Sequence, residues 1–191
     1  MRAAVLVQAA ATMPVSMGLA KDHLRVDDAA YDRLITTSLA AAVTEFEDIT
    51  GRALIDSTWD QTYDSWPCSD RIQLPKGKVS AVLSVKYVDS TGVETAFADW
   101  DLDEIDAAVV LKAGKQWPVS QLRSWVAITI RFQAGWENDE AVPADIQTAI
   151  LFKLQSGVDG IGGANMGVHE LEKQRMEAIF SRTAMRYRTH R

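Results

Sequence analysis

The segment from Asp27 to Gly51 constrains the fold most strongly, because its apolar residues keep an unbroken helical spacing over the longest stretch of this 191-residue chain. The spacings alternate between four and three residues and predict one apolar helix face, formed by Ile35, Leu39, Ala42, Phe46 and Ile49. We expect a helix near residues 28–50, with Asp27 as its N-cap and Gly51 as the left-handed residue that ends it. A helix this long must bury its apolar face against other helices of its own chain or against an identical neighbour.

Shorter helical patterns lie on both sides of this segment in the sequence. Ser16 can cap a helix near residues 16–25, in which Met17, Ala20 and Leu24 share one face. Pro143 opens a further helix near residues 143–156. These patterns predict a helical layer built from segments that are far apart in the chain.

Between the helices, the apolar period changes from 3.6 residues to two. Residues 54–66 alternate between an apolar and aromatic face and a face of acidic and hydroxyl side chains, which is typical of a half-buried strand. Residues 3–7 are expected to form an extended arm or an edge strand. The other expected strands, separated by Pro, Gly, Asp and Ser turns, are 71–74, 82–88, 93–97, 107–111 and 125–132. The sequence thus predicts an α+β fold, with a mainly antiparallel sheet of about residues 54–133 inserted between helices.

The C-terminal part differs from the rest in charge. Of the 20 basic and 26 acidic side chains, 6 basic and only 1 acidic side chain lie in residues 173–191. Five glycines occur in the eleven residues 157–167, which indicates a flexible joint. We therefore expect a body of residues 1–156, a joint of residues 157–167 and a basic docking segment of residues 168–191, which includes a C-terminal helix. An acidic body disfavours nonspecific nucleic-acid binding, whereas a basic end can bind phosphate or an acidic protein.

For each group of residues that could form a chemical site, a purely structural role explains the sequence better. Asp99, Asp101 and Asp103 resemble the first ligands of a calcium loop, but Glu104 and Val110 stand where that loop needs glycine and a bidentate glutamate. The glycine-rich stretch has no phosphate-loop lysine, and the three histidines lack metal-ligand spacing. We predict no catalytic residue, no metal and no cofactor. The six tryptophans lie among acidic residues, which favours core and interface packing over stacking on nucleic acid.

The sequence also bears on the compartment. Cys68 is the only cysteine, so no internal disulfide is expected. The alanine-rich start of the chain is too weakly apolar for a signal peptide, and no segment has the roughly 20 apolar residues of a membrane span. We expect a chain that is neither exported nor inserted in a membrane.

Residues 14–156 carry a series of short segments in a defined order. They are PVSMGLAKDHLRVDD, TGRALI, STWDQTYDSWP, RIQLPKGKVSAVLSVKYVDSTGV, QWP at 116–118, RFQAGW and VPADIQTAILFKL. In type and order these segments resemble the head-to-tail connector (adaptor) proteins of tailed bacteriophages and of related gene transfer agents. The resemblance does not extend to residues 1–13 or to the glycine-rich stretch and the basic tail.

This resemblance implies a structural protein of the virion, without enzymatic activity and made in the host cytoplasm. Such proteins form a ring, commonly of twelve identical subunits, beneath the portal vertex, and connect the DNA-filled capsid to the next neck, stopper or tail-completion protein. DNA passes through the lumen of the ring without specific binding. We expect neighbouring subunits to meet through apolar and aromatic surface that one subunit cannot bury alone.

The basic segment is then expected to dock on the portal, and a surface outside the subunit is expected to order it. The arginines suit carboxylate partners and the apolar residues between them suit interface anchors. The predicted docking residues are Phe180, Arg182, Met185, Arg186, Tyr187, Arg188 and Arg191. Two hypotheses from other classes remain: a nucleic-acid-binding module that acts through the basic tail, and a hydrolase with a site built from scattered residues.

Overall fold

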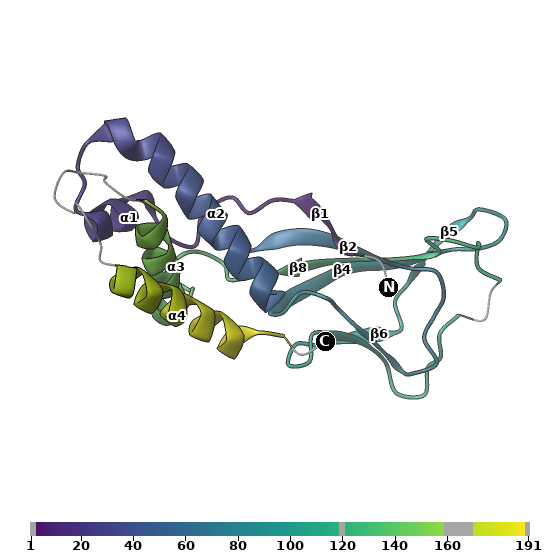
Figure 1. Ribbon diagram of the computed structural model, residues 1–191. Coiled ribbons are helices and arrows are strands. Elements are labelled where there is room, and N and C mark those ends of the chain that lie inside the picture. The colour runs from purple at the N-terminus through teal and green to yellow at the C-terminus, as the bar shows by residue number, and fades with distance from the viewer. Residues whose placement is uncertain (1–2, 119–120, 159–169, 190–191) are drawn as a thin grey trace. The chain divides into compact units, whose positions relative to one another are not determined.

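The computed structural model describes residues 3–118, 121–158 and 170–189 (Figure 1). Over these residues the chain forms four α-helices and two antiparallel sheets, which confirms the predicted α+β fold. The helices and strands belong to two compact units. Residues 12–55 join with 136–158 and 170–189 in a helical unit, and residues 3–11 join with 56–135 in a sheet unit.

In the helical unit, α1 (Met17–Leu24) begins as expected at Ser16, whose Oγ accepts a hydrogen bond from the Leu19 N–H at 3.3 Å. The long helix α2 is shorter at its start than predicted, because a 3-10 turn, η1 (Ala29–Tyr31), precedes it. Asp28, rather than the predicted Asp27, caps this turn by accepting the Ala30 N–H at 2.8 Å. Helix α2 (Asp32–Thr50) then ends as predicted at Gly51, where φ is 68°.

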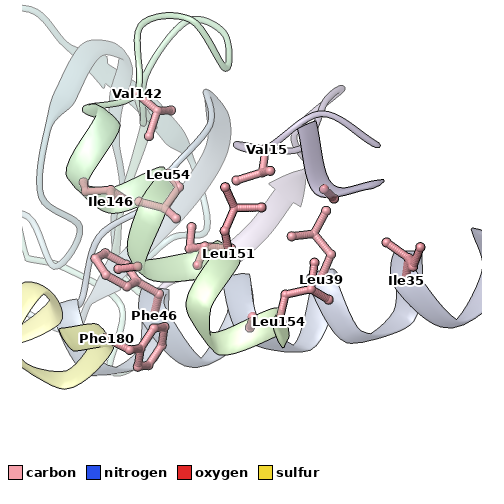
Figure 2. Close-up of a cluster of buried hydrophobic side chains, with 14 of the residues drawn as sticks. Val15, Ile35, Leu39, Phe46, Leu54, Val142, Ile146, Leu151, Leu154 and Phe180 are labelled. Carbon is pink, nitrogen blue, oxygen red and sulfur yellow. The ribbon is translucent and has the colours of Figure 1, made fainter. Parts of the chain in front are cut away.

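Two further helices complete this unit: α3 (Ala144–Gly157), which follows Pro143, and α4 (Glu170–Tyr187). The predicted apolar face of α2 is buried against them, in a core that also receives the segment before α1 (Figure 2). Its largest fully buried side chains are Ile35, Phe46, Leu54, Ile146, Ile150, Leu154 and Phe180. Burial of each such side chain contributes about 1.5–3 kcal/mol, so α3 and α4 provide much of the stabilisation that α2 needs.

The larger sheet of the sheet unit has five strands in the order β1-β2-β8-β4-β5, and every neighbouring pair is antiparallel. The strands are β1 (Val5–Gln8), β2 (Ser57–Tyr63), β8 (Ile128–Ala134), β4 (Val79–Val88) and β5 (Glu94–Phe97). The predicted hairpin of residues 82–97 is present as β4 and β5, and the predicted N-terminal edge strand is present as β1. Strand β4 contains two register shifts against β8.

The smaller sheet has the order β3-β7-β6, formed by β3 (Arg71–Gln73), β7 (Ala108–Leu111) and β6 (Trp100–Asp103). The expectation of one sheet is therefore corrected, because β3, β6 and β7 pair with one another and not with the strands of the larger sheet. The buried side chains of this unit come from both sheets and include Ile72, Val85, Val109, Ile130 and Phe132. Over the described residues, no helix combines the length and the apolar character that crossing a bilayer requires.

The predicted division into a body, a joint and a docking segment falls partly outside the described residues, since these exclude 159–169. Within them, α4 belongs to the helical unit and contributes to its core. The prediction that a surface outside the subunit orders the basic segment is thus wrong for residues 170–189. These residues have their own stripe of buried side chains, which packs on the subunit's other helices.

Candidate assembly surfaces

One face of α4 is built to pack on α2 and α3. Phe180 is 1% exposed, and its ring meets that of Phe46 edge-on, with centroids 5.6 Å apart (Figure 2). Thr183 and Ala184, one turn further along the helix, are also buried. The spacing of three and four residues places these side chains on one face, so α4 is an amphipathic helix of the subunit core.

Lys153 of α3 joins the three helices through charge. Its Nζ lies 3.0 Å from Oε1 of Glu45 on α2 and 2.9 Å from Oε2 of Glu177 on α4. Ser156 donates a second hydrogen bond to Glu177, at 2.9 Å. Burial alone would raise the pKa of Glu177, but the hydrogen bonds from Lys153 and Ser156 outweigh it and lower that pKa. The carboxylate is therefore held in its charged form against α3.

The C-terminal end of α4 is fixed to the rest of the helical unit by a second set of polar contacts. The Tyr187 hydroxyl donates to the carboxylate of Asp145 at 3.1 Å, and Arg186 forms an ion pair with the same carboxylate. The Arg52 Nε donates to the Tyr187 carbonyl at 2.6 Å, and the Thr189 N–H donates to the Thr50 carbonyl at 2.9 Å. Burial, followed by the hydrogen bond to Asp145, raises the pKa of the Tyr187 phenol. Residues 186–189 are thus tied to both α2 and α3.

The predicted docking residues divide into two groups in the structure. Phe180 and the half-buried Tyr187 contact the subunit itself, so their surfaces are used internally. The exposed members among the described residues are Arg182, Met185, Arg186 and Arg188, while Arg191 lies outside the described residues.

Arg182, Met185 and Arg186 share one outer face of α4, because they follow a spacing of three and four residues. Met185 is 61% exposed at the centre of this group, which we call the basic face of α4. The internal partners Arg52, Asp145 and Lys153 were not predicted from the sequence. A usable signal was present in the tail itself, because Met176, Phe180, Thr183 and Tyr187 repeat at helical spacing and predict an internally packed helix face.

In the sheet unit, four aromatic side chains form one cluster. Trp66 stacks on Trp117 with centroids 4.8 Å apart and planes within 7°, and both rings contact Phe97 of β5. Trp66 also meets Tyr87 of β4 edge-on at 5.9 Å. The cluster joins the segments after β2 and β7 to the β4–β5 hairpin, as expected for tryptophans used in packing.

Exposed apolar side chains remain elsewhere in this unit. Trp125 is largely exposed, with only the Arg123 guanidinium over its ring at 5.6 Å. All four residues of β1 are exposed, as are most residues of β5 at the opposite edge of the sheet. These surfaces, with the basic face of α4, are the candidates for contacts with other subunits or proteins.

The side chains that could have served as metal ligands or catalytic groups make structural contacts instead. Asp103 accepts the backbone N–H groups of Ile105 and Asp106 in the turn after β6, and Asp99 pairs with Lys115. His23 contacts Gln155 and Phe152 of α3. Among the described residues, no group of three or more His, Cys, Asp or Glu side chains is placed to hold a metal ion.

The sequence matches no protein-family model and no curated protein. The fold, by contrast, is similar to chains in solved structures of gene transfer agent (GTA) particles. The virion of a native GTA particle contains a chain with a TM-score of 0.76 and 25% identity, and the neck of an empty GTA particle, computed with C6 symmetry, contains one with 0.75 and 26%. Each match covers 100% of this chain and 97% of the other.

A chain in the neck of a native GTA particle, computed with C12 symmetry, has the same fold, with a TM-score of 0.72 and 24% identity over the same coverage. These matches are therefore not restricted to residues 14–156, on which the resemblance in the sequence rests. The neighbours thus agree with the resemblance seen in the sequence: this chain is similar to chains of gene transfer agent particles, one of them in the neck.

Proposed function

We propose that the protein is a structural component of a virion neck, where it forms the head-to-tail adaptor ring beneath the portal. The observation that carries this proposal is the full-length similarity to a chain of a GTA virion and to a chain of a GTA neck, which covers both the helical and the sheet unit. All three neighbours are parts of GTA particles, and the predicted location in the virion rests on them. In this role the chain is a structural protein and catalyses no reaction.

The ring is proposed to contain identical copies of this chain, twelve in number. Neck structures with sixfold and twelvefold symmetry support repeated subunits around one axis. The excess of acidic over basic side chains in the chain also fits a ring through which DNA passes, since an acidic lumen repels phosphate and permits sliding.

The portal is the proposed partner of the basic face of α4, and a stopper or other neck protein is the proposed partner below the ring. Arg182 of this face and Arg188, which follows the end of α4, are exposed and have no ion pair among the described residues, so both can bind carboxylates of another protein. Met185 supplies an apolar anchor between them. Arg186 is already paired with Asp145, which argues that it supports the helix end first.

The alternative function, nucleic-acid binding through the basic tail, is favoured by the same arginines. It is disfavoured by the ion pair between Arg186 and Asp145, which occupies one of these arginines with a carboxylate of the subunit itself. DNA contact would also bind phosphate strongly at every copy in a ring and oppose sliding.

Deletion of the gene tests the proposed function. An adaptor joins two completed assemblies, so its loss should leave DNA-filled heads and separate tails, with no joined particles in electron micrographs. Expression of the wild-type chain in the same cells should restore joined particles. Joined particles in the absence of the protein, or a block before DNA packaging, would contradict the proposal.

A further inference from the structure

The five-stranded sheet ends in two different strands that are open on one side. In the order β1-β2-β8-β4-β5, strand β1 pairs only with β2, and β5 pairs only with β4. Each end strand therefore presents a row of backbone N–H and C=O groups that are not used by the sheet. Such edges are templates on which a strand from another chain can add.

Strand β1 is an unusually unprotected edge. Val5, Leu6 and Val7 are 62%, 46% and 47% exposed, although each is a strongly apolar residue. No charged residue occurs anywhere from Ala3 to Ala20, and β1 contains no proline. Proteins usually protect exposed edges with lysine, proline or a covering segment, because an apolar edge aggregates. An edge without this protection indicates a strand that is covered in the assembled state.

Strand β5 offers a matching edge on the opposite side of the same sheet. Glu94, Thr95 and Ala96 are exposed, and the preceding Val93 is 56% exposed. The strand is held in place by its pairing with β4 and by the contact of Phe97 with the aromatic cluster. It is therefore a fixed strand whose one charged side chain, Glu94, is paired with Lys86 of β4 at 2.7 Å, and whose open side offers backbone groups.

We propose that β5 of one copy pairs with β1 of the next copy, so that the five-stranded sheets of neighbouring subunits join into one continuous sheet around the ring. This inference rests on the proposed ring. Contact between two different edges of the same chain is a head-to-tail contact, which repeats from copy to copy and closes a ring when the rotation fits. The neck neighbours have such rotational symmetry. Pairing of β1 with a second β1 would instead stop at a dimer.

The topology also fixes the direction of the new pair. All four neighbouring pairs in the sheet are antiparallel, and the number of strands is odd, so β1 and β5 run in the same direction. A small rotation from one subunit to the next preserves that direction. The strands of adjacent copies thus pair in parallel, and the apolar side chains of Val5 and Val7 are covered by the neighbour.

Cysteine cross-linking in purified particles tests the pairing. The background variant is Cys68→Ser, which removes the only cysteine, an exposed one. Val5→Cys and Thr95→Cys are then introduced together. A short bis-maleimide links the two cysteines, and its length allows the link to form in more than one register of the β1–β5 pairing. The proposal expects a ladder of covalent oligomers on a denaturing gel. Each single variant should give no ladder, because one cysteine per chain can link at most two copies.

The control pair is Val5→Cys with Ile105→Cys. Ile105 is 96% exposed in the turn between β6 and β7, so its cysteine is at least as accessible as that of Thr95→Cys. No ladder is expected from this pair. A ladder from the control but not from the test pair, dimers from Val5→Cys alone, or linkage of Val5→Cys to another protein would each overturn the proposal.

A second variant pair gives an independent readout. Val7→Lys places a charge on the β1 edge, whereas Ile105→Lys places one at an exposed site outside it, and both should leave the melting temperature of the free chain unchanged. Val7→Lys should reduce the number of copies per particle at least tenfold, and Ile105→Lys should not. Normal incorporation of the Val7→Lys chain would contradict the pairing. If the wild-type chain is absent from particles, the proposed function itself is wrong. If the chain is present but the expected cross-links do not form, only the strand pairing is wrong.

Discussion

At the scale of single residues, His23 shows how a polar side chain can support helix packing. It lies half-buried between α1 and α3, where its Nε2 is 2.9 Å from Gln155 Oε1 and its ring contacts Phe152 edge-on. Burial lowers the pKa of His23, and the hydrogen bond to Gln155 only partly offsets this. The sequence offers no signal for this contact, because Gln155 is 132 residues away.

This shift predicts a pH dependence of stability. Because the folded state has the lower pKa, the unfolded state binds more protons as the pH falls below about 6.5, and the free energy of unfolding then decreases. The stabilisation is complete above that pH. We expect a lower melting temperature at about pH 5.5 than at about pH 7.5, and a smaller difference in His23→Gln, whose side chain does not titrate. Thermal unfolding followed by circular dichroism checks this, and an unchanged difference in the variant would show that other groups cause it.

At the scale of elements, the sequence predicted the positions of those helices and strands that depend on local residue patterns. The alternating spacing located α2, and the change of period at Gly51 located the inserted strands, since both signals come from neighbouring residues. Strand pairing could not be derived in the same way. Whether β3 pairs with β7 or joins the larger sheet depends on contacts between residues more than 30 positions apart. The start of α2 was misplaced because Asp27 and Asp28 are equivalent as caps until the 3-10 turn selects one of them.

The tail shows a different limit of sequence analysis. Its charge and the glycines before it predicted a separate segment, whereas Phe180 and its neighbours pack in the helical core. Charge dominated that prediction because six basic side chains lie in residues 173–191, whereas the buried positions of α4 are only Phe180, Thr183 and Ala184. Arg182, Met185, Arg186 and Arg188 are exposed, and their docking role stays a prediction.

Phe180→Ala should destabilise the attachment of α4. Removing a buried phenylalanine ring costs about 3–5 kcal/mol, because contacts are lost and a cavity remains beside Phe46. We expect cleavage within α4 at lower protease concentration than in the wild type, and a lower melting temperature. Met185→Ala is the matched control on the exposed face and should change neither by a measurable amount. Equal protease resistance of Phe180→Ala and the wild type would show that α4 does not depend on this contact.

The proposed docking role of the basic face requires substitutions that spare the core. Truncation after Gly167 is unsuitable, since it also removes Phe180 from the helical core. The double variant Arg182→Glu/Met185→Asp changes two exposed side chains and should leave the melting temperature within about 1 °C of the wild type, because such surface changes cost less than about 0.5 kcal/mol. We expect a loss of joined particles of at least tenfold, measured by electron microscopy.

The matched control for this variant is Arg33→Glu, an exposed charge reversal on α2. It should leave the yield of joined particles unchanged. If Arg182→Glu/Met185→Asp also assembles normally, the basic face of α4 has no role in docking, although the protein can still be a neck component.

At the scale of the whole molecule, the chain combines features of a subunit that acts through contacts. The helical unit has an internal core, the sheet unit has two open edges, and the exposed basic face of α4 lies on a helix that the subunit itself fixes. A full-length similarity to chains of GTA particles, with identities near 25%, indicates that this architecture tolerates extensive sequence change. Such tolerance is expected where function depends on shape and surface, because no small set of reactive groups must be kept.

The most direct measurement is a symmetry-imposed reconstruction of the neck in purified particles by electron cryomicroscopy. The account predicts a ring of identical copies of this chain between the portal and the next neck protein, with the basic face of α4 against the portal and β5 of each copy beside β1 of the next. Both units of the chain should fit the density, and the density should show whether the ring contains twelve copies. Density for a different protein at this position, with this chain absent from the particle or located outside the neck, would contradict the account.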